Sequence, residues 1–124
     1  MSKRTLSAGD TMSEAALQSA IIELAHALGY ICAHFRPALM KIGGTLTYRT
    51  PVAADGKGYP DLNLLKAGRV IYIEVKSEKG KQSPEQLRWE EMIRASGAEF
   101  YLFRPSDWLS DKVTQVLNST PVQV

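Results

Sequence analysis

The chain has 124 residues, 44% of them hydrophobic and 23% charged, which is typical of one globular domain large enough to bury a core. Its formal net charge of +2 gives no general sign of a nucleic-acid binder. The single Cys32 excludes an internal disulfide and suits a reducing, cytoplasmic compartment. No apolar run approaches the ~20 residues that a membrane-spanning helix needs, so no membrane partner is expected.

The first predicted element is a helix that follows a polar, flexible N-terminus at residues 1–10. Thr11 and Glu14 fit a capping box, apolar residues then recur at helical spacing, and Gly29 offers an end. Residues 30–35 read as a strand. Between residues 37 and 58 the pattern is lost, although 45–49 fits a short strand. A connection of this length is often functional.

A hairpin is predicted next, with strands at 61–66 and 69–76 and a tight turn at Ala67-Gly68. Ser83 and Gln86 form a second capping box, which opens a helix ending near Gly97. Residues 99–104 fit a further strand, and Ser106 is expected to cap a last helix that precedes a flexible tail at 119–124. The order α-β-β-β-α-β-α predicts an α/β fold, a mixed sheet flanked by helices, in one domain at residues 11–118.

Charged residues occupy the ends of the predicted hairpin strands. Asp61 opens the first strand, and Glu74-Val75-Lys76 ends the second. Because side chains alternate along a strand, Glu74 and Lys76 project to one side while Val75 points into the core. Closure of the hairpin would place Asp61 beside Glu74. Two adjacent carboxylates repel each other unless a cation neutralises them, and their hard oxygen atoms suit Mg²⁺ or Mn²⁺. Such a site, with Lys76 beside the attacking water or the phosphate, supports phosphodiester hydrolysis.

These residues carry a resemblance to a known family. Pro60-Asp61 followed by Glu74-Val75-Lys76 looks like the PD-(D/E)xK nuclease signature. With Glu14 on the first helix, "GYPDLNLL", "IYIEVK" and Gln86, the chain resembles the VRR-NUC (virus-type replication-repair nuclease) family, in particular its stand-alone phage and bacterial members. The resemblance covers roughly Glu14 to Arg104. One departure is the segment from Met40 to Gly58, which is longer than the family pattern leads us to expect.

The resemblance implies a restriction-endonuclease-like core and a role for each matching residue. Asp61 and Glu74 would ligate the metal with the Val75 backbone carbonyl, and Glu14 would complete the acidic cluster. Lys76 would assist the nucleophilic water, and Gln86 would support the site from the next helix. The stand-alone members look like homodimers that cut branched DNA such as four-way junctions.

Simpler interpretations exist for each of these residues. Glu14 and Gln86 fit their capping boxes, and Asp61 could cap the preceding turn. Glu74 and Lys76 could be a solvated ion pair. His26 and His34 are not expected to be ligands, and Trp89 and Trp108 are more typical of a core or an interface than of base stacking.

Basic residues flank the proposed site in sequence and are candidate phosphate contacts. By contrast, the acidic stretch at residues 85–92 is expected to face away from DNA. Other interpretations stay open: a flap, nicking or restriction-type endonuclease, a non-catalytic nucleic-acid-binding module, or a structural subunit that oligomerises through the hairpin. The candidate DNA contacts are Arg36, Arg49, Lys57, Lys66, Lys79 and Lys81.

Overall fold

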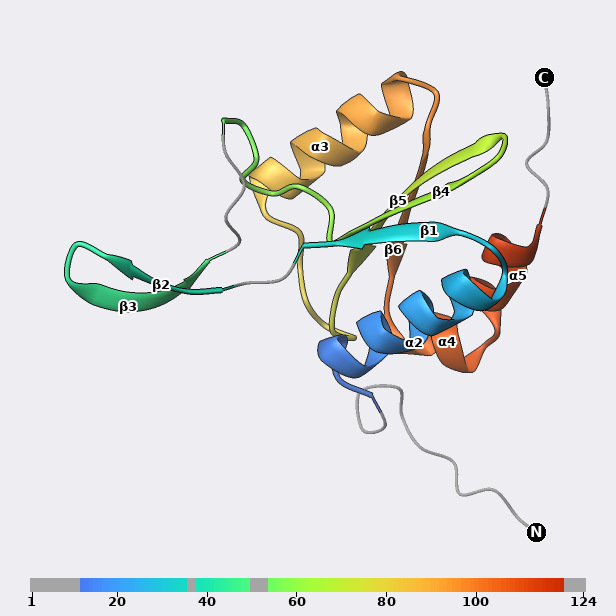
Figure 1. Ribbon diagram of the computed structural model, residues 1–124, viewed down its shortest axis with the longest axis horizontal. Coiled ribbons are helices and arrows are strands. Elements are labelled where there is room, and N and C mark those ends of the chain that lie inside the picture. Colours follow the sequence, from blue (N-terminus) through green and yellow to red (C-terminus); the bar gives the residue numbers. More distant parts are fainter. Residues whose placement is uncertain (1–11, 36–37, 50–53, 120–124) are drawn as a thin grey trace, which may run out of the picture.

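The computed structural model describes residues 12–35, 38–49 and 54–119, so residues 1–10 and 120–124 of the expected tails lie outside it. A mixed four-stranded sheet in the order β1-β4-β5-β6 forms the centre (Figure 1). The β1, β4 and β5 strands pair antiparallel, and β5 and β6 pair parallel. This confirms the predicted mixed sheet. The strand bounds are Ile31–His34 for β1, Leu62–Lys66 for β4, Arg69–Val75 for β5 and Glu99–Phe103 for β6.

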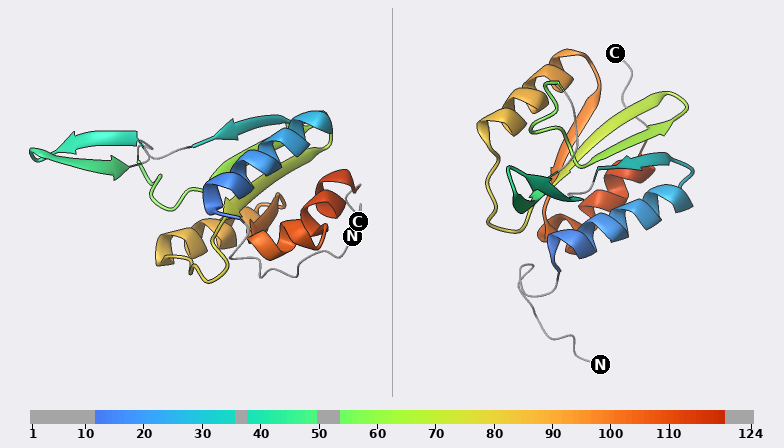
Figure 2. Two further views of the ribbon diagram at one scale, coloured as in Figure 1. Left: turned by 90° about the horizontal axis from the view of Figure 1, so that it is seen from below. Right: turned by 60° about the vertical axis from the view of Figure 1, so that its left-hand side comes forward.

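Helices cover both faces of this sheet. The α2 (Glu14–Ala27), α4 (Pro105–Leu109) and α5 (Lys112–Asn118) helices lie on one side, and α3 (Pro84–Ala95) lies on the other (Figures 1 and 2). Alternate residues of β4 and β5 point to the first side and form its core with the helices. Ile93 and Phe100 are buried on the α3 side. The main core comprises Leu17, Ile21, Ala25, Tyr30, Leu62, Leu64, Ile71, Ile73, Val75, Phe103, Val113 and Leu117.

The starts of α2 and α3 test the two predicted capping boxes. Ser83 Oγ accepts from the Gln86 N–H at 3.2 Å while Gln86 Oε1 accepts from the Ser83 N–H at 2.8 Å, which confirms the second capping box. At α2 the predicted Thr11–Glu14 box is wrong. Ser13 is the cap, because its Oγ accepts from the Ala16 N–H at 3.1 Å, and Thr11 lies outside the described residues.

The last predicted helix is two helices. Asp107 Oδ2 accepts from the Arg104 N–H at 2.7 Å, so the cap lies at Arg104 rather than at Ser106. Pro105 explains the shift, since proline favours the first helical position and fixes the cap just before it. The chain then breaks at Asp111, which has a left-handed φ of 63° and separates α4 from α5.

A two-stranded ribbon occupies most of the segment where periodicity is lost. The β2 strand (Ala38–Ile42) pairs antiparallel with β3 (Thr45–Arg49), and neither pairs with the main sheet. Gly43 and Gly44 join them with φ values of 58° and 85°, a conformation that favours glycine at both positions. The ribbon projects well beyond the rest of the molecule (Figure 2). No described helix combines the length and apolar character needed to span a membrane.

Candidate active site

The β4–β5 hairpin brings Asp61 and Glu74 together at one end of the sheet. Leu62 pairs with Ile73, so Asp61, one residue before β4, comes opposite Glu74. The Val75 N–H donates to Asp61 Oδ2 at 2.7 Å and fixes the orientation of the Asp61 carboxylate. Both acids lie on the α3 side of the sheet, since Leu62 and Ile73 point to the other side. The juxtaposition predicted from strand alternation is confirmed.

Glu74 is the most unusual residue of this pair. Its side chain is 1% exposed, and neither carboxylate oxygen has a hydrogen-bond partner among the described residues. Burial raises the pKa of Glu74 to about 7; the Lys76 ammonium and the Gln82 amide oppose this rise, and the carboxylates of Asp61 and Glu90 add to it. An acid in this state is a poor structural element, because a buried charge without a partner is costly. A solvated ion pair with Lys76 is therefore ruled out as the explanation of Glu74.

Two further predicted residues act on this pair electrostatically. Burial raises the pKa of Asp61; the Val75 N–H opposes the rise, the Glu14 carboxylate adds to it, and the Lys76 ammonium opposes it. Glu14 lies in the first turn of α2 and is exposed. The structure thus gathers four of the predicted residues at one end of the sheet. Glu14 comes from α2, and Asp61, Glu74 and Lys76 come from the β4–β5 hairpin, far from it in sequence.

Gln86 belongs to a different arrangement. Its side-chain carbonyl accepts from the Ser83 N–H, so that atom is committed to the start of α3. Gln86 therefore has a capping role at the start of α3. Any contribution of Gln86 to catalysis stays a prediction, and so does metal ligation by the Val75 carbonyl.

Side chains that were not expected near the site come from α3 and its preceding loop. Gln82 Nε2 donates to Glu90 Oε1 at 2.9 Å, and Glu90 Oε2 accepts from Arg94 Nε at 2.9 Å. The Glu90 carboxylate adds to the rise in the Glu74 pKa, so this acid of α3 lies near the site, and the expected orientation of the 85–92 stretch away from DNA stays a prediction. Glu90 stands four residues after Gln86, and this helical spacing is the signal that would have indicated it.

The loop after β5 is ordered by a residue that sequence analysis did not single out. Arg104 Nη1 donates to the carbonyls of Ser77 at 2.7 Å, Glu78 at 3.2 Å and Gly80 at 2.7 Å. Lys79 and Lys81 are exposed on or just after this loop, which directly follows β5. Two exposed lysines thus follow β5, on or beside a loop whose backbone Arg104 holds.

The other predicted DNA contacts fall in several places. Lys57 is 84% exposed and lies 3.8 Å from Glu85. Arg49 is in β3 of the ribbon, and Arg36 lies outside the described residues. Lys66 was predicted to flank the site but lies at the far end of β4, where its ammonium donates to the Leu28 carbonyl at 2.7 Å.

His34 ends β1 and pairs in register with Leu62, one residue from Asp61. Its Nε2 is 2.7 Å from Gln18 Oε1, and Gln18 follows Glu14 by one helical turn on α2. This contact ties β1 to α2 beside the acidic cluster. His26 is exposed near the end of the same helix.

The donor set fits a divalent cation with an open coordination shell. Glu74 offers two oxygens without partners, and Asp61 Oδ1 adds a further carboxylate oxygen beside them. Among the described residues no group of three or more His, Cys, Asp or Glu side chains is arranged around one metal position. Mg²⁺ commonly binds proteins through one or two carboxylates and completes its shell with water and phosphate, so two acids suffice for it.

Comparisons with known proteins give one family and one solved structure of interest. The family model described as "VRR-NUC domain" matches residues 12–107. A solved structure titled "VRR_NUC domain" is 28% identical, with a TM-score of 0.57, over 82% of this chain and 94% of that chain. No match was found among curated proteins.

Proposed function

The chain belongs to the VRR-NUC domain family, which implies a nuclease of the PD-(D/E)xK type, and from this premise we propose a divalent-metal-dependent endodeoxyribonuclease. The observation that carries the proposal is the pair formed by Asp61 and Glu74. Asp61 is held by the Val75 N–H, and Glu74 is buried with both oxygens unpaired. Without a cation this arrangement is unfavourable, and with one it becomes a ligand set.

In this mechanism Asp61 and Glu74 hold Mg²⁺ or Mn²⁺, and Glu14 adds negative charge from α2. A cation held there would supply acidification of the attacking water and compensation of the charge that develops on the phosphate. Lys76 positions that water and stabilises the phosphate oxygens through its ammonium group. The buried position of Glu74 excludes competing solvent from one side of the site.

We further propose that the substrate is branched DNA, such as a four-way junction, and that the active form is a homodimer. A symmetric dimer would present two such sites to two strands related by a two-fold axis. Lys57, Lys79 and Lys81 supply exposed positive charge for the phosphates, while the near-neutral net charge limits binding elsewhere.

The test compares cleavage of labelled duplex, single-stranded, nicked, flap and four-way-junction DNA of common sequence. Each is incubated with Mg²⁺, Mn²⁺ or EDTA. We expect cleavage only with the metals, strongest on the junction. Asp61→Asn should lower the cleavage rate by at least roughly 10²-fold. It removes the negative charge that Asp61 offers to the cation, with little change in the shape of the side chain. Glu91→Gln, an exposed acid of α3, is the matched control.

Three outcomes would decide against parts of the proposal. Full activity of Asp61→Asn would refute the assigned site. Cleavage of flap or nicked DNA in preference to junctions would select the alternative endonuclease activity. DNA binding by the wild-type protein with no cleavage under any metal condition would favour a non-catalytic binding module.

A further inference from the structure

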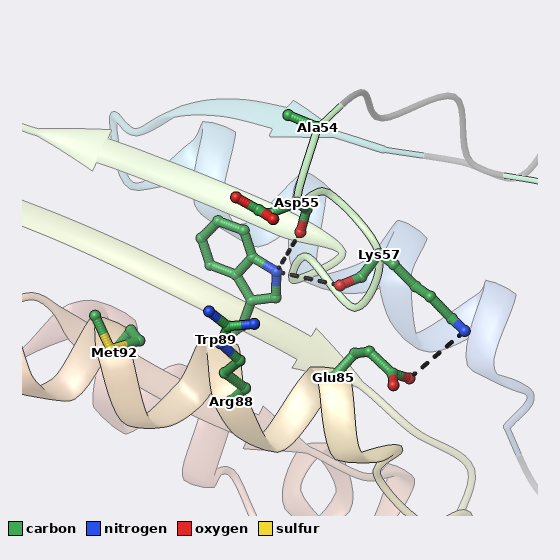
Figure 3. A pocket seen from close by; sticks show the side chains of 7 residues that line it. All are labelled: Ala54, Asp55, Lys57, Glu85, Arg88, Trp89 and Met92. Atoms are coloured by element: carbon green, nitrogen blue, oxygen red, sulfur yellow. Dashed lines mark hydrogen bonds and ion pairs between the residues drawn. The ribbon is translucent and has the colours of Figure 1, made fainter.

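A pocket of about 390 Å³ lies between the start of α3 and the segment 54–57 (Figure 3). It does not include Asp61 or Glu74, but its residue Lys57 is only four positions before Asp61 in the chain. From Lys57 to Asp61 the backbone can span at most about 14 Å, which is roughly four nucleotide steps of duplex DNA. Gly58 packs directly on α3, because a Cβ there would lie 2.6 Å from the Glu85 carbonyl carbon. The pocket and the acidic pair therefore keep a short, fixed separation.

Trp89 provides an aromatic wall of this pocket. Its Nε1 donates to the carbonyls of Asp55 at 3.1 Å and Lys57 at 3.2 Å, as the dashed lines of Figure 3 show. Tyr59 meets the indole edge to face, with centroids 4.9 Å apart. The indole is thus fixed in place before any ligand arrives, and its only polar atom is already satisfied. What it offers a ligand is a preorganised π surface.

The remaining lining combines the apolar Met92 with two cations and two acids. Met92 is 62% exposed beside the indole. Arg88 is exposed and reaches the pocket from α3, one residue from Trp89, and Lys57 carries the other cation. Asp55 and Glu85 supply the acids, and Glu85 makes only a long contact with Lys57 at 3.8 Å. A flat apolar ring that carries an anionic group suits this lining.

From these observations we propose that the pocket takes one unpaired nucleotide of the DNA substrate. The base stacks on Trp89 and its phosphate contacts Arg88. A base inside a duplex has both faces stacked, so only an unpaired nucleotide can enter. This inference rests on the proposed function and narrows its substrate: the enzyme selects DNA with an unpaired nucleotide within a few positions of the cut.

The test measures binding rather than cleavage, with Ca²⁺ in place of Mg²⁺. The probes are two labelled DNAs of the same sequence, one a perfect duplex and one with a single unpaired nucleotide. We expect the wild-type protein to prefer the second by roughly 5- to 150-fold, the range that base–aromatic stacking gives. Trp89→Leu should bring this ratio near one, and Trp89→Phe, which keeps a ring, should retain most of it.

Two further variants separate the phosphate contact from general charge. Arg88→Ala should lower the ratio, whereas Lys112→Ala, which removes a distant exposed cation, should leave it unchanged. As a readout that needs no variant, iododeoxyuridine at the unpaired position should photocrosslink to Trp89, located by mass spectrometry. This result decides the matter if Trp89→Leu fails to fold.

The pocket assignment is overturned by a wild-type ratio near one, by a ratio that Trp89→Leu leaves intact, or by crosslinks elsewhere. If Trp89→Leu instead changes the mass of the protein in solution and not the ratio, the pocket holds a protein side chain and the proposal is wrong. Asp61-dependent cleavage would survive each of these results. Conversely, a preserved ratio without any cleavage would overturn the proposed activity alone.

Discussion

Glu74 shows how one residue can work against the stability of its own fold. It is fully buried among packed strands, and no described group donates a hydrogen bond to it. A Gln or an apolar residue there would be more favourable for folding alone. Such a local conflict is typical of functional sites, where activity requires an arrangement that stability does not.

The raised pKa of Glu74 makes stability depend on pH. The folded protein retains the Glu74 proton up to about pH 7, whereas the unfolded chain loses it near 4.5. The stabilising contribution is therefore complete below pH 4.5 and is lost as the pH rises through 7. In EDTA, the wild-type free energy of unfolding should fall between pH 5 and 8.5 by on the order of 3 kcal/mol from this group. Glu74→Gln should lack this fall in urea denaturation curves.

The control for this experiment is Glu91→Gln, which changes an exposed acid and should keep the wild-type pH profile. Adding Mg²⁺ at pH 8 should restore stability to the wild-type protein, by about 2.7 kcal/mol at 100 times the dissociation constant, and not to Glu74→Gln. Equal pH profiles for the wild type and Glu74→Gln would contradict the assigned pKa.

Lys76 allows catalysis to be separated from binding. Burial raises the pKa of both Asp61 and Glu74 and the Lys76 ammonium opposes both rises, so Lys76 lies close to both carboxylates. Lys76→Ala should reduce the cleavage rate by roughly 10²-fold or more, because positioning and charge stabilisation are lost together. Metal binding, measured by calorimetry, should persist, since an ammonium is not a ligand.

Lys76→Arg should recover little of the rate, because a planar guanidinium does not fill the place of a compact ammonium. DNA affinity in Ca²⁺ should fall only slightly, as one phosphate contact among several is removed. A parallel loss of affinity and rate would mean that Lys76 only docks DNA.

At the scale of the elements, Arg69 joins the sheet to the last helix. Its guanidinium donates to both oxygens of Glu99, at 2.8 and 2.6 Å, to Tyr30 Oη at 2.8 Å and to the Ser119 carbonyl at 2.7 Å. Only 8% of Arg69 is exposed. The residue links β5, β6 and the end of α5.

We expect Arg69→Ala to destabilise the protein by about 3–5 kcal/mol, because it removes the cation paired with Glu99 and the Arg69 donor to Glu99 Oε2 and the Ser119 carbonyl. Thermal unfolding should show a fall of at least about 10 °C. Arg94→Ala removes an exposed i, i+4 pair with Glu90 and should cost only about 0.5 kcal/mol. Similar losses for the two variants would refute the structural role of Arg69.

The sequence predicts those elements whose signals are local. The Ser83 box and the Ala67-Gly68 turn are encoded within a few residues, and both are confirmed. The pattern predicts only the strand at 45–49 of the ribbon, although Gly43-Gly44 is itself a hairpin signal. The split after α4 has no such signal, because it depends on Asp111 adopting a left-handed φ that its residue type does not require.

The residues of the site also divide into those that local signals predict and those that depend on tertiary packing. Asp61, Glu74 and Lys76 lie on one hairpin, so strand alternation and one turn predict their meeting. The proximity of Glu90 to Glu74 depends on how α3 packs across the sheet. The ordering of the 77–80 loop depends on Arg104, which comes after α3 in the chain, whereas the loop comes before it. Tertiary packing of this kind cannot be derived from local spacing.

At the scale of the whole molecule, we propose that the ribbon is the surface through which the homodimer forms. A two-stranded ribbon alone is only marginally stable in water, and Leu46 on it is 65% exposed. Light scattering of the wild-type protein should report about twice the 13.7 kDa chain mass. Replacement of residues 38–49 by a short Gly-Ser linker should give a monomer whose melting temperature, at low concentration, changes little.

Exchange of Leu46 for Ala, which keeps the ribbon, is the matched milder variant and should weaken the dimer without abolishing it. A monomeric wild-type protein at all concentrations would contradict the dimer. A linker variant that still has twice the chain mass would place the contact elsewhere on the surface.

The position of the ribbon in the topology also bears on how such a protein can change over evolutionary time. His34 and Leu62 are paired neighbours, so the chain leaves and re-enters the sheet at adjacent points. The entropic cost of closing a loop rises by only about 0.6 kcal/mol for each doubling of its length. Insertions here would therefore be tolerated at nearly constant stability, and Asp61 would keep its orientation because Val75, not the loop, holds it. This junction is a place where new substrate preferences can be acquired by exchanging a segment while the chemistry is inherited unchanged.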